Sequence, residues 1–439
     1  MKFLVAILVT AATAHAQDKI PLPLSLRKSI EIALAPEGNT RIEIAQEIIH
    51  QAEARRSLAR AALLPNLDGV VSYADMTRNL NAFGFTFPSF PGFRFSSFAG
   101  PFGILDARAN VTQSVLDFGN VRRYQSARTA VGVARQEQSH VRTQVTDQVA
   151  RAYLGALRSA AQVDAAKANV ALAESIRALA LSQKNAGSGT GIEVTRAEVQ
   201  LSNEHGRLSI ARNEYNKAQL QLLRAMDLRL DTAVELTDKL SYTPLEPIAI
   251  EQAVMAALAA RSDLKAQQER ERVAQISYQA NALDRLPSIA AFGDYGSIGR
   301  EFAESRATRS VGLSLRVPIF DGGRRDARRA ESASQLRQER IRTRDLREQM
   351  EFELRIAFDS LRSSDLQVAT AEQGLALAQK EYDQAERRYK AGVAPHIEVT
   401  DAQTRLARAR DTRVIALFAH NLARLDLGTA MGSVERYLP

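Results

Sequence analysis

Two segments of the chain alternate apolar and polar residues with a period of two, as a strand with two unlike faces does. The apolar face of the first holds Leu105, Ala107, Ala109, Val111 and Val115, with Gln113 as an exception. The apolar face of the second holds Val311, Leu313, Leu315, Val317 and Ile319. A soluble sheet with one wet face has this pattern, and so has a membrane strand between lipid and a lumen. Taken alone, the alternation favours the soluble sheet.

Two longer stretches, 120–185 and 324–390, keep apolar residues at spacings of three and four, as one face of a helix does. The stripes hold Val141, Val145, Val149, Ala152, Tyr153, Ala156 and Leu157 in the first, and Leu346, Met350, Leu354, Ala357 and Leu361 in the second. A helix of about 65 residues is about 100 Å long. Few globular domains contain such a rod, whereas a structure that crosses the periplasm would.

Three motifs occur twice, in the same order, about 205 to 222 residues apart. The pairs are Ala186-Gly187 with Ile192–Thr195 against Ala391-Gly392 with Ile397–Thr400, Leu116–Gly119 against Phe320–Gly323, and Leu64–Leu67 against Leu286–Ile289. Such a period is too long for a solenoid and indicates a duplicated unit of about 200 residues. We therefore predict a first repeat over 17–235 and a second over 236–439.

Each half is predicted to contain the same elements: a short helix, a longer helix, two strands, a very long helix and a returning helix. The short helices are expected over 24–34 and 248–258, the longer ones over 39–64 and 261–286, and the returning ones over 192–228 and 397–431. Each Ala-Gly motif falls where the chain reverses between the long and the returning helix.

The first 16 residues have the features of a secretory signal peptide: a positive start at Lys2, an apolar stretch, and Ala14-His15-Ala16 as the cleavage signal. The apolar stretch is too short to span a bilayer, which takes about 20 residues. The mature chain is therefore expected outside the cytoplasm. Together with the long helices, this favours membrane strands over a soluble sheet.

Composition excludes several classes of protein. The chain has no cysteine, which rules out disulfides, thiolate metal sites, cysteine nucleophiles and an N-terminal lipid-modified cysteine. The formal net charge is +8, or +7 once Lys2 is removed with the signal. In a cytoplasmic protein this charge would suggest nucleic acid, but a secreted chain rarely meets any, and no nucleic-acid partner is predicted. No run of 18 apolar residues follows the signal, so no transmembrane helix is expected.

No catalytic, cofactor-binding or metal-ligating residue is predicted, and the chain is not expected to be an enzyme. The glycine-rich segment 187–191 follows a helix and lacks the Lys-Ser/Thr end of a phosphate-binding loop. Asp117-Phe118-Gly119 matches a kinase tripeptide without the other kinase elements. The histidines at 50, 140, 205, 396 and 420 show no ligand spacing.

Four strands cannot complete a membrane protein within one chain. Open sheet edges cannot face lipid, because each unpaired N–H or C=O group costs several kcal/mol there. Membrane barrels need about eight strands or more. The pattern therefore predicts an assembly of at least two chains, with helices that close into a matching tube.

The chain resembles TolC-like outer membrane factors, the outer membrane efflux protein family, over essentially its whole mature length. The resemblance rests on the twofold repeat, on Val317–Gly323 before a long helix, and on Ala391-Gly392-Val393 leading into Ile397–Ala402. It implies a mainly α fold with membrane β structure: a tandem-duplicated protomer of a trimeric, twelve-stranded β-barrel that continues as a long periplasmic α-helical barrel. It further implies a homotrimer in the cell outer membrane, in contact with outer membrane lipid, a periplasmic adaptor (membrane fusion) protein and an inner-membrane pump.

The same resemblance implies site residues at the helix tips. Glu398 and Asp401 fall where family members place acids that ring the closed periplasmic entrance, and Glu193 is the repeat equivalent of Glu398. The repeat partner of Asp401 is Arg196, and Ala394 stands where some members have a basic residue that helps lock the entrance. An ordinary acid at a helix start is the alternative. The turns expected to meet the adaptor are Ala186, Gly187, Ser188, Ala391, Gly392 and Val393.

Two local features have more than one interpretation. The segment Phe83–Phe102 holds eight phenylalanines and is predicted to be the external loop of the first hairpin, packed over the pore or into the membrane interface, or simply a surface loop. The segment Arg324–Arg347 holds nine arginines, which suit a solvated helix face, contact with anionic inner-leaflet lipid, or a positive lumen wall.

The predicted function is a passive exit duct of a tripartite efflux or type I secretion system. The alternative is a periplasmic helical-hairpin adaptor or scaffold protein without a channel. Drugs, metals and proteins all remain candidate cargoes of such a duct.

Overall fold

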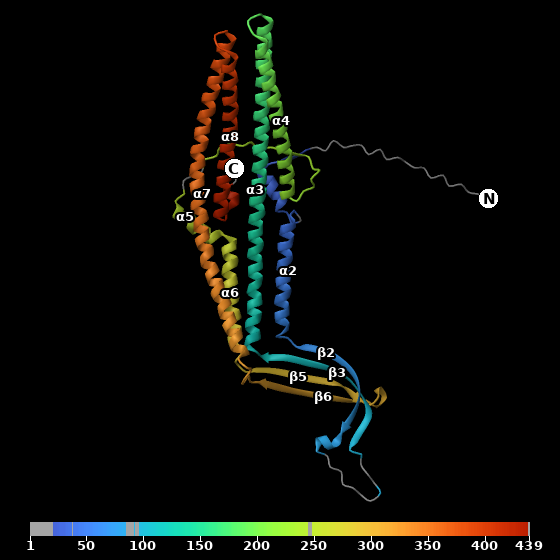
Figure 1. The fold of residues 1–439 in the computed structure, drawn as a ribbon. Coiled ribbons are helices and arrows are strands. Elements are labelled where there is room, and N and C mark those ends of the chain that lie inside the picture. The colour runs from blue at the N-terminus through green and yellow to red at the C-terminus, as the bar shows by residue number, and fades with distance from the viewer. Residues whose placement is uncertain (1–20, 37, 85–91, 93–95, 245–247, 438–439) are drawn as a thin grey trace, which may run out of the picture. The chain divides into compact units, whose positions relative to one another are not determined.

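A computed structural model describes residues 21–36, 38–84, 92, 96–244 and 248–437 (Figure 1). The predicted signal peptide lies outside these residues. The chain forms two compact units, each with segments from both halves of the sequence. Unit 1 comprises Met1–Glu43, Val141–Arg261 and Met350–Pro439, and unit 2 comprises Ile44–His140 and Ser262–Gln349.

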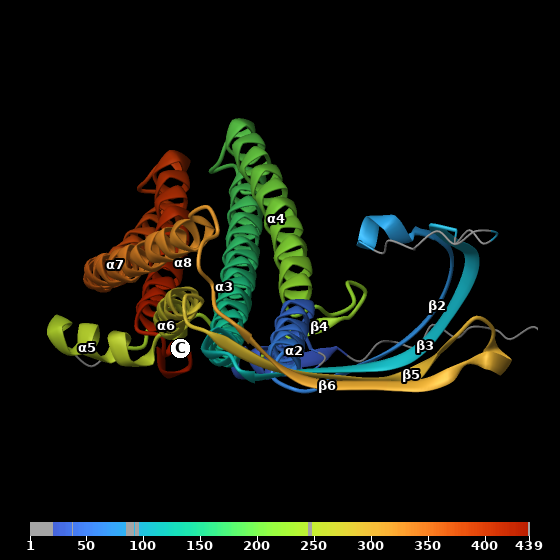
Figure 2. The same ribbon diagram turned by 90° about the horizontal axis from the view of Figure 1, so that it is seen from below.

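Unit 2 contains one four-stranded antiparallel sheet in the order β2-β3-β5-β6, which curls along its strands in Figure 2. The strands are β2 (Asn66–Asn79), β3 (Phe98–Leu116), β5 (Ser288–Gly299) and β6 (Arg306–Arg316). The short helices η1 (Leu80–Phe83) and η2 (Phe302–Glu304) follow β2 and β5. Both predicted alternating segments are strands here, although β6 ends at Arg316, so Val317 and Ile319 lie beyond it. Pro318 has no N–H for a strand ladder, which accounts for the earlier end.

The strand register gathers the apolar positions on one face of the sheet. Leu67 pairs with Val111, Val111 with Gly293, and Gly293 with Val311. This face is uncovered, because Leu67 is 71% exposed and Val311 88% exposed. The opposite face is polar and contains Arg108, which makes ion pairs with Asp106 and Asp294. The sheet therefore has one apolar and one charged face, as expected for a strand between lipid and a lumen.

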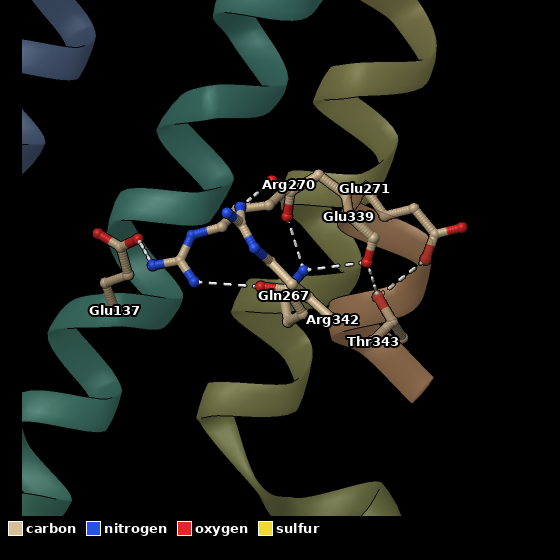
Figure 3. A network of polar contacts seen from close by, with 7 residues as sticks. All are labelled: Glu137, Gln267, Arg270, Glu271, Glu339, Arg342 and Thr343. Carbon is tan, nitrogen blue, oxygen red and sulfur yellow. Dashed lines mark hydrogen bonds and ion pairs between the residues drawn. The ribbon is translucent and has the colours of Figure 1, made fainter. Parts of the chain in front are cut away.

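The helical part of unit 2 consists of α6 (Ser262–Leu283), most of α2 (Thr40–Ala61), and the first parts of α3 (Phe118–Asn185) and α7 (Arg324–Lys390). A polar network joins α3, α6 and α7 (Figure 3). Gln267 Nε2 on α6 donates to Oε2 of Glu339 on α7 at 2.8 Å, and Thr343 Oγ1 on α7 donates to Oε2 of Glu271 on α6 at 2.9 Å. Gln267 and Thr343 are both buried, so these hydrogen bonds set which residues of α6 and α7 face one another.

Unit 1 contains the rest of α3 and α7, the returning helices α4 (Gly191–Ala225) and α8 (His396–Ala430), and three shorter helices: α1 (Leu26–Ala33), α5 (Ile250–Ala260) and η3 (Val434–Tyr437). Its largest hydrophobic cluster includes Leu24, Val149, Leu154 and Leu222, each no more than 1% exposed. The stripe predicted for the first long helix is thus buried against α1 and α4. Burial of such a stripe supplies most of the stability of a long amphipathic helix.

Two strands of unit 1 were not predicted: β1 (Leu22–Leu24) and β4 (Val234–Leu236), which form a separate parallel pair. The described chain therefore has six strands: the four predicted ones, which form the sheet of unit 2, and this additional pair, which the count of four left out. Tyr153 fastens this pair to α3, because its hydroxyl donates to the Leu24 carbonyl at 2.9 Å. The predicted boundary between the repeats, 235/236, falls within β4.

The phenylalanine-rich segment is also not a loop throughout. Its last residues, Phe98–Phe102, belong to β3, where Phe98 pairs with Asn79 and Phe102 with Met76. Residues 85–91 and 93–95 of the segment lie outside the described part of the chain. In the described ranges, no helix is both long and apolar enough to cross a membrane.

Candidate gate at the helix tips

Each long helix of unit 1 ends in a tight glycine turn. Gly187 and Gly392 have φ of +76° and +74°, the left-handed conformation that glycine adopts without a Cβ penalty. Ser188 N donates to the Gln183 carbonyl at 3.0 Å, and Val393 N donates to the Arg388 carbonyl at 3.1 Å. These bonds satisfy the last carbonyls of α3 and α7, so the turns end the helices and reverse the chain.

The two turns belong to one packed group of helix ends. Tyr382, Tyr389 and Leu406 share a hydrophobic cluster with Ile176 and Val194, which come from α3 and α4. Gln183 Nε2 reaches across and donates to the Tyr389 carbonyl at 3.3 Å. Between the turns lies a hollow of about 570 Å³, and its lining includes residues of both tips. The six turn residues predicted to meet an adaptor are all exposed, and four of them line the hollow: Ser188, Ala391, Gly392 and Val393.

The three predicted gate acids have different local environments. Glu193 caps its own helix, because its Oε2 accepts from Thr190 N at 2.9 Å. Glu398 pairs with Arg388, whose Nε lies 2.9 Å from Oε1. Asp401 is exposed, with no basic partner within 4.0 Å among the described residues. Of the three, Asp401 thus has the least compensated charge.

One residue of this site, His396, was not predicted to belong to it. His396 begins α8 and is only 2% exposed. Its ring meets that of Tyr389 edge-on at 5.6 Å, and Nδ1 lies 3.2 Å from Thr400 Oγ1. Its Nε2 has no hydrogen-bond partner among the described residues.

Burial lowers the pKa of His396, an effect that Glu193 opposes and Arg196 reinforces. The repeat contained a signal for this residue: Gly191 occupies the equivalent position in the first half, so the second half has a large ring where the first has no side chain.

The arrangement gathers charged and titratable side chains at the helix tips. It supplies carboxylates, a guanidinium and a buried imidazole at an exposed turn. In the described part of the chain, no group of three or more His, Asp or Glu side chains is placed to hold a metal ion.

Comparison with known proteins identifies the family. The sequence profile described as "Outer membrane efflux protein" matches residues 32–227 and 253–433, which is most of the chain. The chain belongs to this family. It is an outer-membrane efflux channel with a periplasmic helical part, the exit duct of an export system.

Two relatives of known role illustrate the range of the family. The pyoverdine export outer membrane protein OpmQ of Pseudomonas putida is 25% identical over 421 residues, 92% of this chain and 85% of the relative. The alkaline protease secretion protein AprF of Pseudomonas aeruginosa is 26% identical over 308 residues, 66% of this chain and 60% of the relative.

Solved structures share the fold. The Campylobacter jejuni CmeC outer membrane channel superposes with a TM-score of 0.77 at 16% identity, covering 93% of this chain and 86% of that one. VceC of Vibrio cholerae superposes with a TM-score of 0.76 at 17% identity, covering 93% and 96%. The predicted mainly α protomer with membrane β structure is therefore confirmed.

Proposed function

We propose that three copies of this chain form a passive duct that receives cargo from an inner-membrane pump through a periplasmic adaptor protein. The observation that carries the proposal is the sheet of unit 2. Among the described residues, its outer strands, β2 and β6, each have a single neighbour, and its apolar face is uncovered. Such a sheet becomes stable in lipid only when other copies pair with both edges.

Asp401 and Glu398 would ring the periplasmic entrance of this duct, with Glu193 beside them. In a trimer each acid occurs three times around the axis. Like charges in a narrow, poorly solvated passage repel one another, and they attract cations. Because Arg388 already neutralises Glu398, Asp401 supplies most of the cation attraction in our proposal.

Single-channel recording in planar bilayers tests the gate. We expect a cation-selective pore that divalent cations block from the periplasmic side, and a weaker block in the Glu398→Ala/Asp401→Ala variant. Asp401→Ala alone should weaken the block more than Glu398→Ala. Arg388→Ala should strengthen it, because it frees the Glu398 carboxylate.

The matched control is Glu174→Ala/Asp345→Ala, which removes the same two charges from exposed positions on the long helices. It should leave the block unchanged. If the Glu398/Asp401 variant is blocked as strongly as the parent, these acids are ordinary helix-start residues, which contribute only about 0.3–1 kcal/mol to stability.

The adaptor contact is proposed at the six turn residues, of which Val393 is 66% exposed. A photo-reactive label on Ser188→Cys or Val393→Cys should capture a periplasmic adaptor in cells, and a label on His205→Cys along α4 should not. Equal capture at all three positions would move the contact away from the tips.

The cargo class of this chain is best found with a deletion strain. The relatives named above are described as proteins of pyoverdine export and of alkaline protease secretion, so both small molecules and proteins must be tested. The scaffold alternative, a hairpin protein without a channel, predicts a protein that is extracted without detergent and gives no conductance.

A further inference from the structure

All four connections between the sheet and the helices of unit 2 lie at the same end of the strands. The register pairs Asn66 with Thr112, Leu116 with Ile289, and Ser288 with Arg316. The ends of α2 and α6 and the beginnings of α3 and α7 therefore lie at this helix-connected end of the sheet. We use "arginine belt" for the segments there: residues 55–65, 117–128, 284–287 and 321–329.

The arginine belt is strongly basic. Its four segments hold eleven arginines and four aspartates, with no lysine or glutamate, for a net charge of +7. Some arginines are compensated, such as Arg123 by Asp284 and Arg325 by Asp321. Others have no acidic side chain within 4.0 Å among the described residues and are exposed: Arg55, Arg60, Arg324 and Arg328.

Large apolar side chains are exposed among these arginines. Ile319 is 93% exposed and Phe320 88%, just before α7. Leu58 is 75% exposed, within α2 between Arg55 and Arg60. A wall facing only water would not need such residues. Basic and apolar side chains side by side are typical of a surface that lies in the headgroup region of a membrane.

The belt also continues the apolar face of the sheet. Leu67 and Leu315, 71% and 64% exposed, lie on that face within one or two residues of the helix-connected end of the strands. Because the protein resides in the outer membrane with periplasmic helices, this end of the sheet is where the lipid-facing surface meets the periplasmic leaflet.

We infer that the arginine belt binds the headgroups of anionic phospholipids in the periplasmic leaflet of the outer membrane, with Ile319 and Phe320 inserted among the upper acyl chains. The inference rests on the outer-membrane location and does not depend on the gate. It selects lipid contact among the three interpretations for Arg324–Arg329, the first part of the arginine-rich segment of α7.

Spin-labelled lipids test the headgroup preference in bilayers that contain the full-length mature protein. The motionally restricted lipid should be enriched in phosphatidylglycerol over phosphatidylcholine by about fivefold. This is the preference expected if each bound anionic headgroup gains the attraction of one arginine, about 1 kcal/mol, that the zwitterionic headgroup lacks. Arg55→Gln/Arg60→Gln/Arg324→Gln/Arg328→Gln should abolish most of the enrichment, and raised salt should weaken it.

The control variant Arg212→Gln/Arg362→Gln/Arg387→Gln/Arg408→Gln removes four exposed arginines of unit 1 and should keep the enrichment. Enrichment that survives in the belt variant overturns the inference. So does loss of the enrichment on adding 10 mM inorganic phosphate at constant ionic strength, because the site would then bind a free anion. Conductance of the same preparation reports separately on the duct.

The absence of tryptophan from the chain allows an independent measurement of depth. Phe320→Trp should be quenched by lipids brominated near the headgroup end of the acyl chains. Val393→Trp at the tip should not be quenched. An unquenched Phe320→Trp would place the belt in water or under protein and would contradict the proposed insertion.

Discussion

Packing holds the His396 ring at the tips. Its Nδ1 lies near Thr400 Oγ1, but its Nε2 has no hydrogen-bond partner among the described residues. Burial lowers its pKa, so the unfolded chain takes up a proton at a higher pH than the folded chain does. The stabilising contribution of neutral His396 is therefore present above about pH 6.5 and is lost as the pH falls toward its folded pKa. The charged and titratable groups around the ring are Glu193 and Arg196 on α4 and Tyr389 on α7.

Acidification should consequently loosen the start of α8. We expect amide exchange of residues 396–402, corrected for the intrinsic rate, to be faster at pH 5 than at pH 7.5. The limit is about tenfold per unit of pKa difference. His396→Phe keeps a ring against Tyr389 and should remove the pH effect, whereas His205→Phe on the exposed side of α4 should retain it. The same acid-induced exchange in His396→Phe would assign the effect to another group.

At the scale of elements, the sequence predicts the helices well because their periodicity extends over many turns. The second long helix was expected over 324–390 and is observed at Arg324–Lys390. The pair β1–β4 was missed because three-residue strands show no period, and Leu22 pairs with Val234 far along the chain. Likewise, the Arg388–Glu398 ion pair and the burial of His396 depend on how the turn at Gly392 folds, which residue types alone do not determine.

Replacing a turn glycine and a helix glycine with alanine should change the free energy of unfolding in opposite directions. Gly392→Ala should destabilise the α7–α8 turn by about 1 kcal/mol, because alanine is strained at positive φ. An added Cβ there meets no atom within 4 Å, so the cost is conformational. Gly206→Ala lies inside α4, also with no atom within 4 Å, and should stabilise by about 0.5–1 kcal/mol.

Thermal unfolding in detergent, followed by helical circular dichroism, measures both changes. The midpoint should fall for Gly392→Ala and rise for Gly206→Ala. A fall of similar size in both variants would mean that crowding by other chains, and not backbone conformation, governs these positions.

The network in Figure 3 predicts how α6 and α7 are coupled. Gln267→Met fills a similar volume but leaves the Glu339 carboxylate with one fewer donor, which should cost about 1–3 kcal/mol. Gln268→Met, at the exposed neighbouring position, should be nearly neutral. Because Gln267 Nε2 and Thr343 Oγ1 both lie within hydrogen-bond distance of the Glu339 carbonyl oxygen, the double variant with Thr343→Val should cost less than the sum of the single changes. Strict additivity would show that the two residues act independently.

At the scale of the whole molecule, the open edge strands of the sheet and its exposed apolar face both indicate that a single copy is incomplete. The strands β2 and β6 leave rows of backbone groups without partners in a single copy, and the adjoining face is apolar. An open edge alone would also suit a soluble protein, in which a loop or a charged side chain protects the edge strand. Together with the outer-membrane location, the open edges and the apolar face support our proposal of a ring in which β6 of one copy pairs with β2 of the next.

The absence of cysteine makes this ring directly testable by cross-linking in outer membranes. Ser72 on β2 and Ser310 on β6 lie on the polar face of the sheet, since Ser72 pairs with Asp106 and Ser310 with Asp294. In the Ser72→Cys/Ser310→Cys variant, a flexible bis-maleimide should join neighbouring copies and give a ladder that ends at three chains. Ser114→Cys/Ala290→Cys lies within one copy, where the two residues are paired, so the same reagent should give only the mass of one chain.

A series of cysteine positions along β6 covers the different registers that two copies could adopt: Thr308→Cys and Ser314→Cys replace Ser310→Cys in parallel samples. A closed ring must link in at least one of them, since its edge strands lie about 4.8 Å apart. If every sample stays at the mass of one chain while the control loses both of its free thiols to the reagent, β2 and β6 do not meet, and the sheet must be completed by a different partner.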